Sequence, residues 1–179
     1  MVARAFDVAR RRGFVSFCRN ETGRLLATLA ASRSGTMAEL GTGAGVGTAW
    51  LRSGMRAGSR ILTAEVDPKL AGAAAEIFRD DADVEVLTGD WSALRDRGPF
   101  SLLFLDAREP KDSGPDAVAD LVEPGGLVVL DDFTPCASWP PVYAGRVDTV
   151  RELWLVDERF TAVELMVAAD TAVLLAARR

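Results

Sequence analysis

A glycine-rich segment at residues 36–50, TMAELGTGAGVGTAW, sets the architecture that the rest of the chain has to satisfy. An apolar run ends at Leu40, glycine then occupies every second position from Gly41 to Gly47, and a helix-compatible run follows. This order predicts a buried strand, a tight turn and the start of a helix. Glycine suits the turn because it adopts backbone angles closed to other residues, and because no Cβ keeps a ligand away from the backbone. The segment therefore predicts a loop that holds a nucleotide-like ligand.

The spacing of these glycines argues against two common nucleotide-binding loops. The dinucleotide fingerprint needs a third glycine that would fall on Val46, Thr48 or Trp50, and the phosphate-binding loop needs a lysine that is absent. The remaining pattern, E-x-G-x-G-x-G from Glu39 to Gly45, resembles motif I of the class I S-adenosylmethionine (SAM)-dependent methyltransferases. In that family the loop passes under a sulfonium amino acid instead of a pyrophosphate. The resemblance implies SAM as the cofactor.

The composition fits one globular domain over residues 1–179. Hydrophobic residues make up 49% of the chain, yet no run of about 18 apolar residues predicts a membrane span. The net charge of -5 offers nucleic acid no electrostatic attraction. Cys18 and Cys136 match no metal or redox spacing, which indicates reduced thiols in a cytoplasmic protein. The absence of histidine excludes Ser-His-Asp and Cys-His catalysis and every histidine-based metal site.

Strand and helix patterns alternate along the chain. Strands are predicted at residues 36–40, 60–66, 84–88, 101–106 and 127–130, and helices at residues 21–32, 69–78, 117–122 and 148–156. Two closing strands, at residues 161–167 and 171–177, are separated by a short turn and predict an antiparallel hairpin. The predicted fold is an α/β sandwich with a mostly parallel seven-stranded sheet, the Rossmann-like methyltransferase arrangement. Residues 1–35 would form a helical segment that packs over the cofactor.

Further motifs of the methyltransferase family fall at the ends of the predicted strands. Glu65 closes the second strand, where the family has an acidic residue and where a carboxylate can accept both ribose hydroxyls. Asp90 follows the third strand, where it would accept from the adenine amine, while Trp91 either covers the ring or belongs to the core. The resemblance implies these cofactor-binding residues: Glu39, Gly41, Thr42, Gly43, Gly45, Glu65, Val66, Gly89, Asp90, Trp91 and Asp106.

Three features resemble, more specifically, the small O-methyltransferases that act on catechol and caffeoyl-CoA. Residues 21–26, ETGRLL, resemble the segment that leans over the methionine end of the cofactor. Asp106 resembles the fourth-strand aspartate, and Asp131 with Asp132 resembles the pair after the fifth strand. The resemblance implies O-methylation of a small acceptor such as a phenol, with Mg, Ca or Mn held by Asp106, Asp131 and Asp132. Such a cation would lower the pKa of the acceptor hydroxyl and orient it.

Two departures from the family pattern leave alternatives open. Glu109 stands where the family has a lysine base, so Lys111 either reaches the site as a catalytic residue beside Asp106 or is a solvated loop lysine. Asp132 stands where the family has asparagine, and it either completes a metal site or turns outward as a loop cap. A metal-independent methyltransferase and a non-catalytic SAM-binding protein therefore remain alternatives. A nicotinamide-dependent oxidoreductase is less favoured, because the third glycine is missing and a terminal hairpin is predicted.

The wall of the acceptor pocket is predicted to come from two segments of the chain. These are residues 14–19 and the segment after the fifth strand, with Phe133, Trp139, Pro140 and Tyr143. Aromatic side chains there would suit a flat small-molecule acceptor, or they could equally be loop packing or contacts of a homodimer. The identity of the acceptor does not follow from the sequence.

Overall fold

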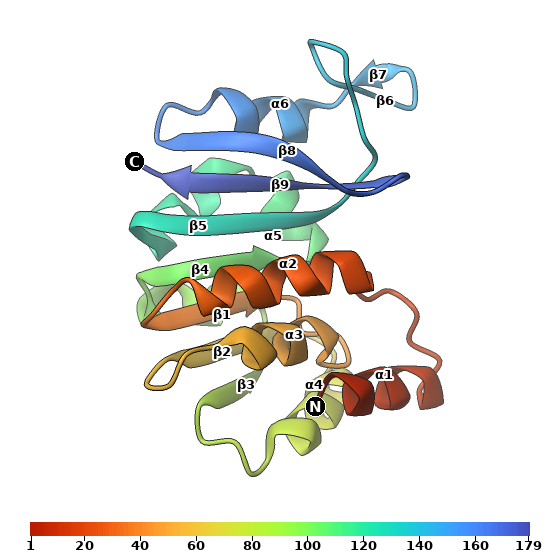
Figure 1. Cartoon of the computed structure of the whole chain (residues 1–179), viewed down its shortest axis with the longest axis vertical. Coiled ribbons are helices and arrows are strands. Elements are labelled where there is room, and N and C mark those ends of the chain that lie inside the picture. Colours follow the sequence, from red (N-terminus) through yellow and green to blue (C-terminus); the bar gives the residue numbers. More distant parts are fainter.

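A seven-stranded sheet runs through the molecule with helices on both faces, as the computed structural model of residues 1–179 shows (Figure 1). The strand order is β3-β2-β1-β4-β5-β9-β8, with β1 to β5 parallel and β9 antiparallel to both of its neighbours. The predicted α/β class, the mostly parallel sheet and the terminal hairpin are confirmed. The strands are β1 (Thr36–Leu40), β2 (Arg60–Glu65), β3 (Val84–Thr88), β4 (Phe100–Leu105), β5 (Val122–Phe133), β8 (Phe160–Ala168) and β9 (Thr171–Arg178), with a separate small hairpin of β6 (Val142–Tyr143) and β7 (Arg146–Val147).

Two helical layers enclose the sheet. The α-helices are α1 (Val2–Arg11), α2 (Asn20–Ala31), α3 (Val46–Gly54), α4 (Pro68–Phe78), α5 (Arg108–Asp112) and α6 (Thr149–Val156), and the short 3₁₀ helices are η1 (Trp91–Arg97), η2 (Pro115–Ala117) and η3 (Ala119–Leu121). Because side chains alternate along a strand, Met37 packs with α2 and α3 in one core, while Ala38 and Leu40 pack with Trp154 of α6 in the other. None of the helices combines the length and apolar character needed to span a bilayer.

The region before β5 differs from the prediction. The helix predicted at residues 117–122 is replaced by the two single turns η2 and η3, and Val122 already belongs to β5. Residues 124–126, which precede the strand predicted at residues 127–130, already lie within β5, where the register with β4 shifts. A Cβ on Gly126 would lie 2.9 Å from the carbonyl oxygen of Phe100, so the strand can continue past this bulge only with glycine there.

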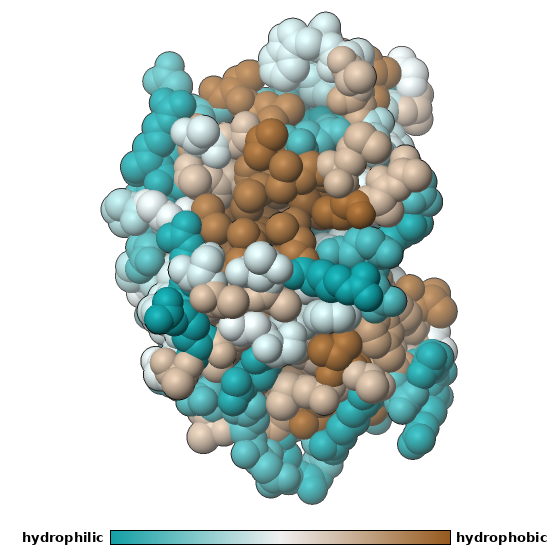
Figure 2. Space-filling model, viewed as in Figure 1, coloured by the Kyte–Doolittle hydropathy of each residue, from teal (hydrophilic) through white to brown (hydrophobic).

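The two halves of the sheet are covered unequally on the side that carries α2. Helices α2 and α3 lie over the middle of the sheet, whereas the front of β5, β9 and β8 above them carries a contiguous apolar surface (Figures 1 and 2). Leu127, Leu165, Val167 and Leu175 are half-buried there beside the core, and Val163 is 48% exposed. This apolar face lies away from the edge where the functional side chains gather.

The carboxyl ends of the five parallel strands meet at one edge of the sheet. β1 lies at the centre, and the chain adds β2 and β3 on one side of it and β4 and β5 on the other. In open α/β sheets, ligands bind at such a switch point, outside the carboxyl ends of the strands. A ligand site is therefore expected among the segments that follow β1, β2, β3, β4 and β5.

Candidate active site

The glycine loop after β1 is held against the segment after β4. The Leu40 carbonyl accepts hydrogen bonds from the backbone N–H groups of Asp106, at 3.0 Å, and Ala107, at 2.8 Å. Gly41 adopts φ +100°, and a Cβ on it would lie 2.8 Å from the Ala107 nitrogen. No other residue meets both the backbone angle and the close approach. Gly41 thus allows the segment after β1 to contact the segment after β4 closely.

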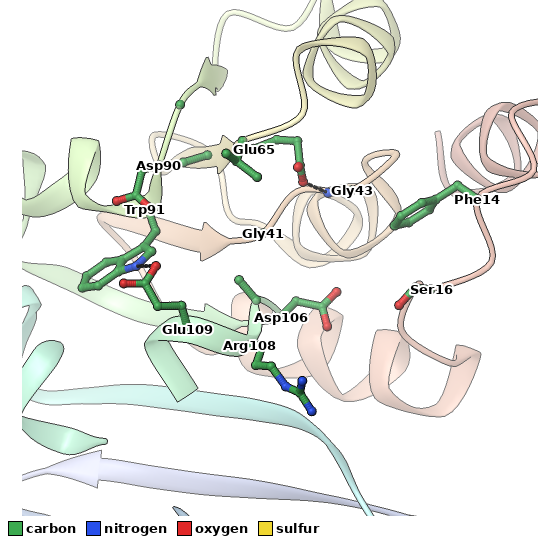
Figure 3. Close-up of a pocket in the computed structure, with 14 residues that line it drawn as sticks. Phe14, Ser16, Gly41, Gly43, Glu65, Asp90, Trp91, Asp106, Arg108 and Glu109 are labelled. Atoms are coloured by element: carbon green, nitrogen blue, oxygen red, sulfur yellow. Dashed lines mark hydrogen bonds between the residues drawn. The ribbon is translucent and has the colours of Figure 1, made fainter. Parts of the chain in front are cut away.

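Glu65 fixes the second part of the same loop (Figure 3). One carboxylate oxygen accepts from the Gly43 N–H at 2.7 Å, and the other accepts from the Asp67 N–H at 2.9 Å. The side chain is mostly buried. A carboxylate oxygen has more than one acceptor position, so each can still receive a ligand hydroxyl. Glu65 therefore shapes the loop and keeps acceptor capacity toward the space beside it.

A cavity of about 410 Å³ lies beside this loop, within the usual size range of small-molecule sites. Most of the predicted cofactor residues line it: Gly41, Gly43, Glu65, Val66, Gly89, Asp90, Trp91 and Asp106. Asp90 is exposed, and one of its oxygens accepts from the Ser92 N–H at 2.9 Å. The hydrogen bonds from Ser92 lower the pKa of Asp90, so it presents a charged acceptor at the cavity.

Three predicted residues, Glu39, Thr42 and Gly45, lie outside the walls of this cavity. Glu39 is fully buried and accepts hydrogen bonds from Thr48 and Thr63, because the alternation along β1 directs its side chain under α3. Burial raises the pKa of Glu39 to about 8, so the carboxyl is mostly neutral at pH 7. Thr42 forms a hydrogen bond with Thr63 at 2.6 Å. These residues support the loop from beneath.

Six further residues line the cavity that the cofactor prediction did not include: Phe14, Ser16, Ala64, Ala107, Arg108 and Glu109. Phe14 and Ser16 come from the segment between α1 and α2, and the Phe14 ring is directed at Gly43 (Figure 3). The sequence placed residues 14–19 in the acceptor wall, whereas Phe14 contacts the glycine loop. Glu109 accepts from the Trp91 indole N–H at 2.9 Å, and Trp91 itself is 6% exposed. The sequence signal for Glu109 was its position three residues after Asp106, where the family has a lysine.

A second cavity of about 470 Å³ adjoins the first and shares Ser16, Asp106 and Arg108 with it. Phe133 and Tyr143 line it, as predicted for the acceptor pocket. Trp139 and Pro140 do not line it and are exposed. The rest of its wall is polar: Lys111, Asp112, Asp131, Asp132, Thr134, Asp148 and Arg151, with Val150 as an apolar exception. Asp106 thus stands at the junction of two connected spaces.

Lys111 reaches into the acidic group at the back of the second cavity. Its side chain is 11% exposed, and Nζ donates to the Asp131 backbone carbonyl at 3.2 Å and to an Asp132 carboxylate oxygen at 3.1 Å. Asp131 is buried and accepts from the Thr22 hydroxyl at 3.1 Å. Burial raises the pKa of Asp106 to about 7 against the opposing charge of Lys111, and burial also raises the pKa of Asp131. The sequence alternative of a solvated loop lysine does not match this placement.

Known proteins with similar sequences carry O-methyltransferase names. A Mycobacteroides abscessus protein named "Putative O-methyltransferase" is 33% identical over 159 residues, which cover 79% of this chain and 72% of that protein. A Mycobacterium ulcerans protein of the same name is 32% identical over 155 residues, covering 78% and 68%. The chain belongs to this O-methyltransferase family. With a Mycobacterium tuberculosis relative, 34% identical over 119 residues, the match spans about half of that protein, 52% of its length. No family model matches the sequence.

Solved structures of other O-methyltransferases share the fold. An O-methyltransferase from Bacillus cereus, solved with S-adenosylhomocysteine (SAH), superposes with a TM-score of 0.80 at 22% identity, covering 99% of this chain and 90% of that one. The O-methyltransferase TomG from Streptomyces achromogenes, solved with SAM, gives a TM-score of 0.78 at 23% identity, covering 99% and 89%. At this identity the likeness establishes the Rossmann-like methyltransferase fold.

The divalent cation that the small O-methyltransferases imply does not fit the donor set of this family member. The chain contains no group of three or more acidic or cysteine side chains arranged to hold a metal ion. Asp131 is buried, but Asp132 adopts φ +70° and its side chain is 71% exposed, so the two carboxylates lie in different environments. The Lys111 ammonium contacts the Asp132 carboxylate and the Asp131 backbone carbonyl. At an effective dielectric constant of about 20, a divalent ion about 4 Å from an ammonium would meet a repulsion of about 8 kcal/mol.

Proposed function

We propose that this O-methyltransferase family member transfers the methyl group of SAM to an oxygen of a small-molecule acceptor. The observation that carries the proposal is the pair of connected cavities that meet at Asp106, one beside the glycine loop and one beside Lys111 and Phe133. A two-substrate transfer needs two adjoining spaces with the reacting atoms at their junction. A cofactor-binding protein without catalysis would need only the first.

The residues of the first cavity suit the parts of SAM. Glu65 would accept from the ribose hydroxyls, since its carboxylate lines the cavity and is already fixed by two backbone N–H groups. Asp90, which is exposed and lines the cavity, would accept from the adenine amine. The backbone of Gly41 and Gly43, which carry no Cβ, would allow the methionine part to approach closely. SAM supplies an electrophilic methyl group when it is bound.

The chain's own residues would position the acceptor and take its proton. The acceptor oxygen attacks the methyl carbon with a lone pair, and the carbon–sulfur bond breaks with its electron pair left on sulfur, which yields SAH. The hydroxyl proton passes to the carboxylate of Asp106, the acid that lines both cavities. Phe133 and Tyr143 would contact a flat acceptor such as a phenol. Both cysteines carry free thiols, which supports a cytoplasmic location within the same proposal.

Two measurements test this function. Titration calorimetry with SAH, SAM and NAD should give saturable heat with SAH and SAM and none with NAD; the reverse result would favour an oxidoreductase. Incubation with SAM and a panel of phenols, catechols and carboxylic acids should give methylated products by mass spectrometry. SAH binding without any product across the panel would favour a non-catalytic SAM-binding protein.

A further inference from the structure

The ammonium of Lys111 is tethered at the centre of the acceptor side. Lys111 is 9% exposed although it belongs to α5, a helix of a single turn. It gives two of its three N–H donors to the Asp131 carbonyl and the Asp132 carboxylate, and the third has no partner in the protein. The side chain lines the second cavity beside Asp106. A nearly buried cation with one free donor thus lines the proposed space for the acceptor.

We infer that Lys111 replaces the divalent cation, so that methyl transfer is metal-independent and the free N–H of Lys111 holds the acceptor oxygen. The inference rests on the proposed methyl transfer. In this role Lys111 donates a hydrogen bond and is not the group that takes the acceptor's proton. Its charge stabilises the negative charge that develops on the acceptor oxygen as the hydroxyl proton moves to Asp106, and the oxygen then attacks the methyl carbon.

The contacts of Lys111 resemble those of a bound metal more than those of a general base. Both of its partners are oxygen acceptors, one a carbonyl and one a carboxylate, as hard cations prefer. The Asp131 carboxylate accepts a hydrogen bond from the Thr22 hydroxyl, whereas Lys111 donates to the Asp131 backbone carbonyl. Two of the three N–H donors of Lys111 are thus used within the protein, and one is left for the ligand. A lysine that removes a proton would instead have to lose its charge while it faces Asp106 and Asp132.

The first experiment asks whether wild-type protein needs or binds a metal. Protein stripped with a chelator and transferred to metal-free buffer should methylate an accepted substrate at the untreated rate, and added Mg²⁺, Ca²⁺ or Mn²⁺ should not raise it. A loss of rate that Mg²⁺ restores would overturn the inference. Mn²⁺ titration followed by electron paramagnetic resonance needs no acceptor. Wild type should show no saturable binding, and a saturable Mn²⁺ site would also overturn it.

The second experiment compares variants of the two lysines of the chain. Lys111→Met should lower kcat about 100- to 1000-fold, the usual loss for one donor to a developing oxyanion. Lys111→Arg, which keeps the charge but cannot act as a base, should retain at least about a tenth of the rate. The exposed Lys69→Met is the matched control and should be unchanged.

Two outcomes of the variant series would count against the role of Lys111. Wild-type kcat in Lys111→Met would overturn the inference, and so would an arginine variant as inactive as the methionine variant, which would indicate proton removal by lysine. SAH affinity, measured by calorimetry, should be equal in all four proteins and shows that each is folded. Failure of wild type to bind SAH would count against the proposed function, whereas the Mn²⁺ result would still test the role of Lys111.

Discussion

The two sides of the sheet edge hold their acidic groups in different ways. On the cofactor side, Glu65 is held by two backbone N–H groups, from Gly43 and Asp67. On the acceptor side, Asp131 and Asp132 are held by the side chains of Thr22 and Lys111. Backbone donors stay in place whatever the neighbouring side chains are, whereas side-chain donors can be removed by one substitution. The cofactor side should therefore be sensitive to backbone geometry and the acceptor side to residue identity.

The largest effect is expected from a substitution in the backbone of the cofactor side. Gly41→Ala would force an alanine to φ +100° and place its Cβ 2.8 Å from the Ala107 nitrogen. Strained φ and overpacking together should lower the free energy of unfolding by about 3 to 5 kcal/mol, as measured by urea denaturation. Gly58→Ala is the control, because Gly58 also has positive φ, +81°, but nothing lies within 4 Å of the added Cβ. Equal losses in both variants would mean that the contact with Ala107 contributes nothing.

Removal of the backbone-held carboxylate should weaken cofactor binding. Glu65→Ala eliminates an acceptor for the ribose hydroxyls and releases the Gly43 and Asp67 N–H groups. The expected loss in SAH affinity is about 1 to 3 kcal/mol, typical of hydrogen bonds to a charged group, and calorimetry measures it. Glu65→Gln keeps the shape and one acceptor oxygen, so it should lose less. An unchanged affinity in the alanine variant would remove Glu65 from the site.

A third prediction concerns the pH dependence of stability that Glu39 causes, a buried acid which, unlike the acids next to Lys111, has no cation beside it. The pKa of Glu39 is raised from 4.5 to about 8 in the folded protein. Between these values the folded state keeps a proton that the unfolded state has lost, so stability falls as pH rises. From pH 6 to pH 8, loss of the Glu39 proton should lower the free energy of unfolding of wild type by about 2 kcal/mol. Glu39→Gln is neutral at every pH and should lack that loss in urea denaturation, whereas parallel pH profiles of the two proteins would contradict the prediction.

The smallest effect is expected from one side-chain hydrogen bond on the acceptor side. Thr22→Val removes the donor to the buried Asp131 carboxylate and should lower the free energy of unfolding by about 1 kcal/mol. Thr28→Val on the same helix is the control, because its hydroxyl donates to the Arg24 carbonyl on an exposed face. Thr22→Val should also reduce kcat, since Asp131 positions Lys111 through its carbonyl. A change in stability equal to that of Thr28→Val would show that the contact is dispensable.

The cofactor side could be predicted from the sequence because its determinants are local. Glycine spacing, strand ends and the acid that closes β2 identified eight of the residues that line the first cavity. Glu39, Thr42 and Gly45, also predicted to bind the cofactor, do not line this cavity, because a motif does not reveal which face of the strand or loop a side chain takes. The acceptor side was less predictable. A single turn of helix, α5, buries Lys111 and turns Glu109 toward Trp91, and no periodicity signals so short an element.

The long sequence separation on the acceptor side has a consequence for the order of folding. Gly43 and Glu65 are 22 residues apart, whereas Thr22 and Asp131 are 109 residues apart. Closing the longer loop costs about 1.4 kcal/mol more in chain entropy. The glycine loop can therefore assemble while β5 is still unpaired. As the chain leaves the ribosome, we therefore expect the proposed place for the methyl donor to form before the proposed place for the molecule that is to be methylated.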